Sequence, residues 1–104
     1  MGVRMIPQGT NLYAFLEGEI DHHSAVFLRT SIDEALVQSC PRELVLDFSG
    51  VTFMDSSGIG LIMGRYRAAS AQDCRVRVMN VKERDLRLMK MSGLEKIVEF
   101  GVCV

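Results

Sequence analysis

The chain has 104 residues, a formal net charge of −1, and 48% hydrophobic against 24% charged residues. These values are typical of one folded domain with an ordinary core, and they exclude a disordered chain. No cluster of positive charge supports a nucleic-acid or lipid-surface role, and no apolar run approaches the roughly 20 residues of a membrane span. We therefore expect residues 1–104 to form a single soluble domain.

The N-terminus and the cysteines favour a cytoplasmic protein. The N-terminal sequence lacks the long apolar segment of a signal peptide. Cys40, Cys74 and Cys103 are odd in number and far apart, so we expect buried free thiols rather than a disulfide framework or a metal-binding CxxC pair.

Two strands are predicted at the start of the chain. A short strand around residues 3–6 is expected to stop at Pro7, because proline cannot donate to a strand ladder. Residues 11–17 are rich in aromatic and aliphatic side chains and predict a second strand that ends at Gly18.

A helix is predicted over residues 24–39, with Asp21 or Ser24 as its N-cap and Pro41 just past its end. Its apolar residues recur at helical spacing. They are Ala25, Phe27, Leu28, Ile32, Ala35 and Leu36.

The rest of the chain continues to alternate between strands and helices. Strands are predicted at 44–48, 75–79 and 97–100, and helices at 59–69 and 81–91. Such alternation favours an α/β fold, with helices packed on a largely parallel or mixed sheet.

The segment Asp55-Ser56-Ser57-Gly58 lies where a strand is expected to give way to a helix, and its chemistry has several explanations. The G-x-S-x-G turn of serine hydrolases is absent. Aspartate and serine can cap the helix. A serine at a helix N-terminus is also a good phosphorylation site, because the free N–H groups and the helix dipole tolerate the added negative charge.

Gly58, Gly60 and Gly64 match neither the dinucleotide-binding fingerprint nor the P-loop. Gly60 and Gly64 lie within the predicted helix, where glycine is unfavourable. We expect another backbone to pass close to them, and we favour the protein core over a partner as its source.

The environments of five charged residues can be predicted from the elements in which they lie. Asp47 is unusual in a buried strand, so we expect it to cap a turn or to lie near Ser56. Arg65 and Arg67 are predicted to lie on a solvated helix face, with contact to an acidic partner as the alternative. Asp85 and Arg87 are expected at the surface.

Three segments resemble a known family. FMDSSGIGLIMGRYR (53–67), GEIDHHSA (18–25) and MSGLEKI (91–97) are similar, in order and spacing, to landmarks of the STAS-domain anti-anti-sigma factors. The resemblance covers nearly the whole chain, and the Asp-His-His after Gly-Glu-Ile is most similar to the sporulation members. It implies a STAS fold, with a mixed four- to five-stranded sheet and helices mainly on one side.

The resemblance also implies a function. The unphosphorylated protein is expected to bind the anti-sigma F serine kinase and so release sigma F for sporulation transcription. The kinase, with its own ATP, is expected to phosphorylate Ser56, with Ser57 as the fallback, and a PP2C-type phosphatase to reverse this. The expected partner contacts are Asp21, His22, His23, Ser24, Asp55, Ser57, Gly58, Ile59, Gly60 and Met63. We expect no catalysis, cofactor or metal, and a monomer when free.

Other interpretations remain open. The chain could serve another STAS pathway, such as a general stress response, or His22 or His23 could carry a phosphoryl group between proteins. The histidines and Asp21 could equally form a helix cap followed by solvated rings. Family members commonly continue into a closing helix, whereas this sequence stops at GVCV, which leaves the cover over residues 97–100 undecided.

Overall fold

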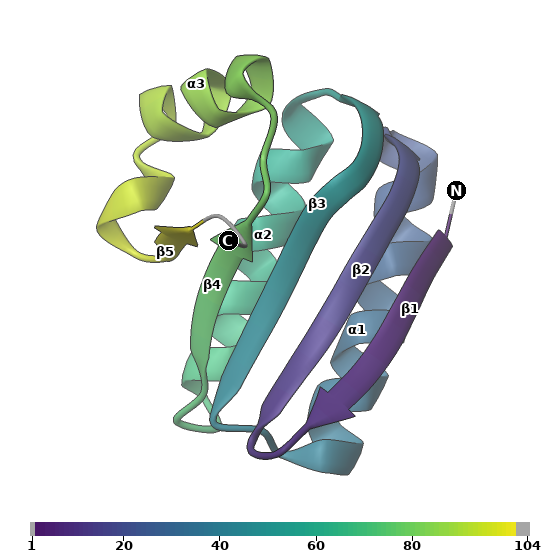
Figure 1. Cartoon of the computed structure of the whole chain (residues 1–104), viewed down its shortest axis with the longest axis vertical. Helices are drawn as coiled ribbons and strands as arrows, with labels where there is room; N and C mark the ends of the chain where they lie inside the picture. Colours follow the sequence, from purple (N-terminus) through teal and green to yellow (C-terminus); the bar gives the residue numbers. More distant parts are fainter. Residues whose placement is uncertain (1, 102–104) are drawn as a thin grey trace.

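The computed structural model describes residues 2–101, so Cys103 and the predictions about the end of the chain lie outside the described residues. Five strands form one sheet in the order β1-β2-β3-β4-β5 (Figure 1). β1 pairs with β2 antiparallel, and the later neighbours pair in parallel. The strands are β1 (Gly2–Gln8), β2 (Asn11–Ile20), β3 (Glu43–Met54), β4 (Arg75–Met79) and β5 (Glu99–Gly101). The helices are α1 (His22–Ser39), α2 (Ser56–Ser70), α3 (Glu83–Met91) and the short 3₁₀ helix η1 (Leu94–Lys96).

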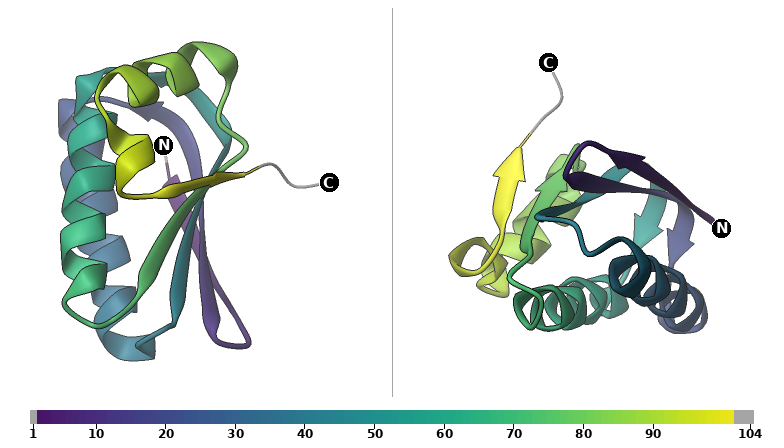
Figure 2. Two further views of the ribbon diagram at one scale, coloured as in Figure 1. Left: turned by 90° about the vertical axis from the view of Figure 1, so that its left-hand side faces the viewer. Right: turned by 90° about the horizontal axis from the view of Figure 1, so that it is seen from below.

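Helices α1 and α2 lie side by side on one face of the sheet, as Figure 2 shows, and α3 crosses one end of it. The core lies between the sheet and these two helices. Its fully buried side chains include Leu12, Leu16, Leu28, Ile32, Leu36, Leu44, Leu46, Phe48 and Ile62. The α/β class, the mixed sheet and the one-sided helix layer are thus confirmed. Within residues 2–101, no helix is both long and apolar enough to cross a membrane.

Several strand boundaries differ from the prediction, including that of β5, which covers Glu99–Gly101 rather than residues 97–100. β1 continues through Pro7, which pairs with Leu12, because β1 is an edge strand and an edge strand tolerates a missing N–H. β2 continues through Gly18, which adopts φ +83° next to a shift in the β2–β3 register. Residues 18–24 are therefore the end of β2 and the start of α1, and Asp21 is the N-cap, in agreement with the interpretation of Asp21 as a helix cap.

β3 is also longer than predicted, because it runs from Glu43 to Met54 rather than stopping at residue 48. Asp47 is buried in this strand, where its carboxylate accepts hydrogen bonds from Ser49 and from the Asn80 side chain. Asp47 therefore bonds within β3 and across to Asn80, and it does not cap a turn as one of the two predictions had it. The neighbouring β4 matches its predicted bounds.

The burial predictions for Cys40 and Asp85 were wrong. Cys40 is exposed in the left-handed C-cap of α1, whereas Cys74 is buried, which raises the pKa of its thiol. Asp85 is buried in the first turn of α3, where a carboxylate interacts favourably with the helix dipole. Phe27 is 49% exposed, because it lies beside the buried stripe of α1 rather than on it.

Candidate functional site

The fold brings two helix starts to the same edge of the sheet. In the parallel register of β2 and β3, Ile20 lies opposite Met54, and each is the last residue of its strand. The Asp55 N–H donates to the Ile20 carbonyl at 3.1 Å. The first turns of α1 and α2 therefore emerge side by side, so that the predicted site residues of two distant sequence segments meet.

A reciprocal capping box closes the start of α1. The Asp21 carboxylate accepts from the Ser24 N–H at 2.9 Å, and the Ser24 hydroxyl oxygen accepts from the Asp21 N–H at 2.9 Å. The Ser24 hydroxyl also donates to the Glu19 carbonyl. Hydrogen bonding from the Ser24 N–H lowers the pKa of Asp21. Ser24 is buried and its hydroxyl completes the cap, and its contact with a partner stays a prediction.

The start of α2 is open by comparison. Asp55 is its N-cap, and the carboxylate accepts from the Ser57 N–H at 2.8 Å. The Ser56 side chain is exposed and makes no hydrogen bond within residues 2–101. Its hydroxyl is the first on α2, at the positive end of the helix dipole. Ser56 is thus sterically open to a modifying enzyme.

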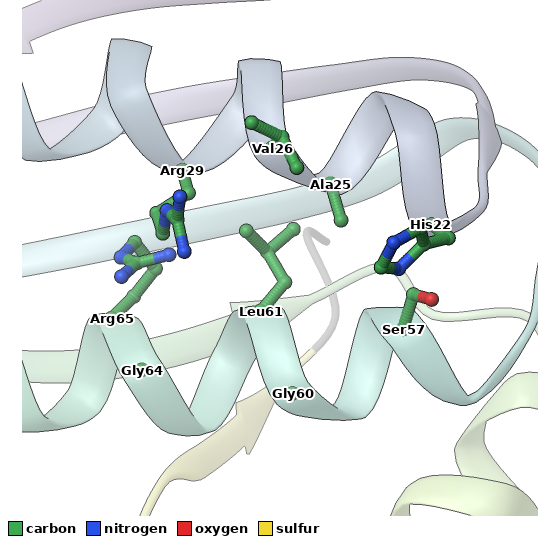
Figure 3. A pocket seen from close by; sticks show the side chains of 9 residues that line it. All are labelled: His22, Ala25, Val26, Arg29, Ser57, Gly60, Leu61, Gly64 and Arg65. Carbon is green, nitrogen blue, oxygen red and sulfur yellow. The ribbon is translucent and has the colours of Figure 1, made fainter.

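Ser57 is less accessible than Ser56. Its side chain is half-buried and points toward the gap between α2 and the His22 ring of α1 (Figure 3). Of the two hydroxyls, that of Ser56 is therefore the more accessible, and Ser57 lines a groove.

Gly58 has a packing role. A Cβ on Gly58 would lie 2.3 Å from Cγ and Sδ of Met54, a core side chain that is 1% exposed. Glycine at this position lets the first turn of α2 close over the end of β3. Gly58 is itself buried, which is consistent with this packing role, and its contact with a partner stays a prediction.

A groove lies between α1 and α2, with a volume of about 310 Å³ (Figure 3). Its lining residues are His22, Ala25, Val26, Arg29, Ser57, Gly60, Leu61, Gly64 and Arg65. At Gly60 and Gly64 an added Cβ would meet no atom within 4 Å. The prediction that the core explains these glycines is therefore wrong. Each glycine still lowers the stability of α2 by about 1 kcal/mol relative to alanine.

Arg65 is 5% exposed, contrary to the predicted solvated face, whereas Arg67 is exposed as predicted. The Arg65 Nε lies 2.7 Å from Asp33 Oδ1 on α1. The two atoms form an ion pair but lack the alignment of a hydrogen bond. Burial lowers the pKa of Arg65, Arg29 adds to this effect, and Asp33 opposes it.

The remaining predicted contact residues fall into two groups. His22, His23 and Gly60 are exposed, and Asp21, Asp55, Ile59 and Met63 are partly exposed. The two histidine rings meet edge to face, with centroids 6.0 Å apart. Among residues 2–101, no group of three His, Cys, Asp or Glu side chains is placed to hold a metal ion.

Sequence reasoning missed a cation–aromatic pair beside the site. The Arg84 guanidinium of α3 lies over the ring of Phe53, 5.3 Å from its centroid, and Phe53 is 38% exposed. A cation–aromatic pair of this kind next to the start of α2 can contribute to a protein contact. The only signal in the sequence was Phe53 itself, because Arg84 comes from a different element.

These features agree with a family of known proteins. The STAS domain model matches residues 6–102. The chain therefore belongs to the STAS-domain family.

Within this family, the chain is similar to antagonists of anti-sigma factors. It is 40% identical over 83 residues to the anti-sigma F factor antagonist of Paenibacillus polymyxa, covering 80% of this chain and 71% of that protein. It is 31% identical over 86 residues to the anti-sigma-B factor antagonist of Bacillus subtilis (strain 168), covering 83% of this chain and 77% of that protein.

Solved structures of the anti-sigma factor antagonist SpoIIAA are also similar. Its unphosphorylated form superposes with a TM-score of 0.82 at 28% identity, covering 95% of this chain and 87% of the other. The phosphorylated form of Bacillus SpoIIAA gives a TM-score of 0.74 at 28% identity, covering 95% and 90%. The resemblance inferred from the three sequence segments is thus confirmed.

Proposed function

We propose that this protein is an anti-anti-sigma factor whose binding to an anti-sigma factor is switched by phosphorylation of Ser56. The observation that carries the proposal is the exposed Ser56 hydroxyl, which makes no hydrogen bond in the described chain, at the first residue of α2. The similarity to antagonists of anti-sigma factors supports the binding role, and the phosphorylated form of SpoIIAA supports the modification.

The surface around Ser56 suits a switch based on charge. A phosphate would add about −1.5 to −2 charges beside the Asp55 carboxylate. The α2 dipole would tolerate it in the free protein, whereas a partner pressed over the helix start would have to bury it. A buried phosphate without a matched cation would cost about 2 to 5 kcal/mol, on the order of 30- to several-thousand-fold in affinity.

The proposed partners are those implied by the resemblance to anti-anti-sigma factors, and the similarity to anti-sigma F factor antagonists supports the anti-sigma factor among them. An anti-sigma F serine kinase would bind the unphosphorylated protein, release sigma F for sporulation transcription, and phosphorylate Ser56 with its own ATP. A PP2C-type phosphatase would remove the phosphate. The protein would act in the cytoplasm as a binding regulator without catalysis of its own. The similarity to an anti-sigma-B factor antagonist favours one alternative, a role in general stress signalling.

The direct test is incubation of the purified protein with an anti-sigma F kinase and ATP, followed by peptide mapping. We expect one phosphate on the peptide that contains Ser56, and none in Ser56→Ala. Ser57→Ala, which changes the neighbouring hydroxyl, is the matched control and should still be phosphorylated. Phosphate on Ser57 alone would contradict the assignment of Ser56.

Acid treatment separates this proposal from phosphoryl transfer by His22 or His23. Phosphoserine survives acid, whereas phosphohistidine is lost. A label that disappears in acid and persists in Ser56→Ala would refute the serine switch. A panel of anti-sigma kinases from the sporulation and stress pathways would then identify the partner by affinity.

A further inference from the structure

The groove between α1 and α2 is kept open by residues that the fold does not require there. Neither Gly60 nor Gly64 adopts a positive φ, and a Cβ at either would meet no atom within 4 Å. Alanine would fit both positions and favour the helix. Packing and backbone geometry within residues 2–101 therefore leave these two glycines unexplained.

The same groove holds positive charge that is incompletely matched. Arg65 is 5% exposed and makes no hydrogen bond within residues 2–101, since its contact with Asp33 is an ion pair without hydrogen-bond alignment. Arg29, at the same end of the groove, has neither an ion pair nor a hydrogen bond in the described chain. Two guanidinium groups thus face one carboxylate. Arg65 is already paired with Asp33, whereas the exposed Arg29 has no carboxylate partner in the described chain, so this end of the groove favours an incoming anionic oxygen.

The groove also continues into the proposed switch. His22 and Ser57 lie at one end, Arg29 and Arg65 at the other, and Gly60 and Gly64 between them (Figure 3). Ala25, Leu61 and the half-exposed Val26 provide apolar walls. A segment that lies along the groove would therefore reach the start of α2 while it contacts both arginines.

We propose that the groove receives a segment of the anti-sigma partner, with its main chain over Gly60 and Gly64 and a carboxylate paired with Arg29 and Arg65. Positive charge at one end makes an acidic side chain the complementary group. This inference rests on the proposed function, because it assigns to that partner a second contact beyond Ser56.

The test measures the affinity of an anti-sigma F kinase for unphosphorylated variants at fixed nucleotide. Gly60→Ala combined with Gly64→Ala adds two methyl groups to the groove, and Arg29→Glu reverses a charge. We expect each variant to bind at least about tenfold more weakly. Arg67→Glu, an exposed arginine of α2 outside the groove, is the matched control and should stay within about twofold of wild type. Thermal unfolding of the alanine variant should show no loss of stability, which separates a blocked groove from a damaged fold.

The outcomes distinguish this inference from the proposed function. If the alanine and Arg29→Glu variants bind like wild type while phosphorylation of Ser56 still abolishes binding, the groove inference is wrong and the switch stands. If wild type neither binds the kinase nor is phosphorylated by it, the proposed function fails first. Nuclear magnetic resonance shifts of groove residues that depend on the protein's own concentration would identify a second copy as the occupant and overturn the inference.

Discussion

Helices α1 and α2 both begin after a capping aspartate, and both carry serines in the first turn. In α1, the Ser24 hydroxyl is buried and bonds to the backbone of Asp21 and Glu19. In α2, the Ser56 hydroxyl is exposed and makes no hydrogen bond in the described chain.

The difference lies in where each serine stands relative to its cap. Ser24 is the third residue of α1 and reaches back to the N-cap, whereas Ser56 is the first residue of α2 and makes no such bond. A hydroxyl that completes a cap contributes to stability, whereas one that makes no bond to the cap stays accessible to a modifying enzyme. The two helix starts therefore make opposite predictions for the same substitution.

Adding negative charge at the open start should produce the largest effect. We expect Ser56→Asp to bind an anti-sigma F kinase at least about tenfold more weakly than wild type, because one fixed charge would be buried at the contact. Ser56→Ala should keep wild-type affinity and resist phosphorylation. Titration calorimetry with both variants checks this. Equal affinity of Ser56→Asp and wild type would contradict the claim that negative charge at the start of α2 blocks partner binding.

Alanine substitutions at two glycines of α2 should change the free energy of unfolding in opposite directions. Gly58→Ala forces a methyl group against Met54 and should lower the free energy of unfolding by about 1 to 3 kcal/mol. Gly60→Ala, only two residues along, meets no atom and should raise it by up to about 1 kcal/mol. Urea unfolding of the two variants measures both changes. A stabilising Gly58→Ala would mean that Met54 moves aside without strain.

The serine-to-alanine pair tests the comparison most directly. Ser24→Ala removes the acceptor for the Asp21 N–H and should cost about 1 to 2 kcal/mol of unfolding free energy. Ser56→Ala loses no hydrogen bond and should stay within about 0.5 kcal/mol of wild type. Chemical denaturation under identical conditions decides between them, and a similar loss in both would show that the two starts do not differ in this way.

The smallest expected effect is on the stability of the protein at low pH. The Ser24 N–H lowers the pKa of Asp21 below its ordinary value of 3.8, so the folded protein holds the carboxylate ionised more readily than the unfolded chain does. This contribution is fully present above the unfolded pKa and is lost as the pH falls through the folded pKa. Asp21→Asn should therefore flatten the decline of stability below about pH 4. An unchanged acid limb in denaturation curves would contradict the cap.

The sequence predicted those elements that local pattern decides. RVRVM alternates because one face of β4 is buried, and the structure gives the same strand at 75–79. An aspartate at the strand-to-helix junction predicted the cap of α2. Neither inference needed knowledge of a distant residue.

Features that depend on a second element were not predictable in this way. Arg65 appeared to belong to a solvated face because Asp33 lies opposite it on another helix. Gly60 and Gly64 appeared to accommodate the core because periodicity does not show how far apart two helices lie. Pairing partners are decided by the packed structure, so the groove and its charges could be found only there.

Pro7 within β1 has a consequence for the protein as a whole. Strands at the border of a sheet offer free amide groups to which other chains can add, a common route to aggregation. A proline there has no N–H to offer, and Arg4 adds charge along the same border. Pairing of β1 with the edge strand of another molecule is thus disfavoured, which would limit aggregation even at high protein concentration.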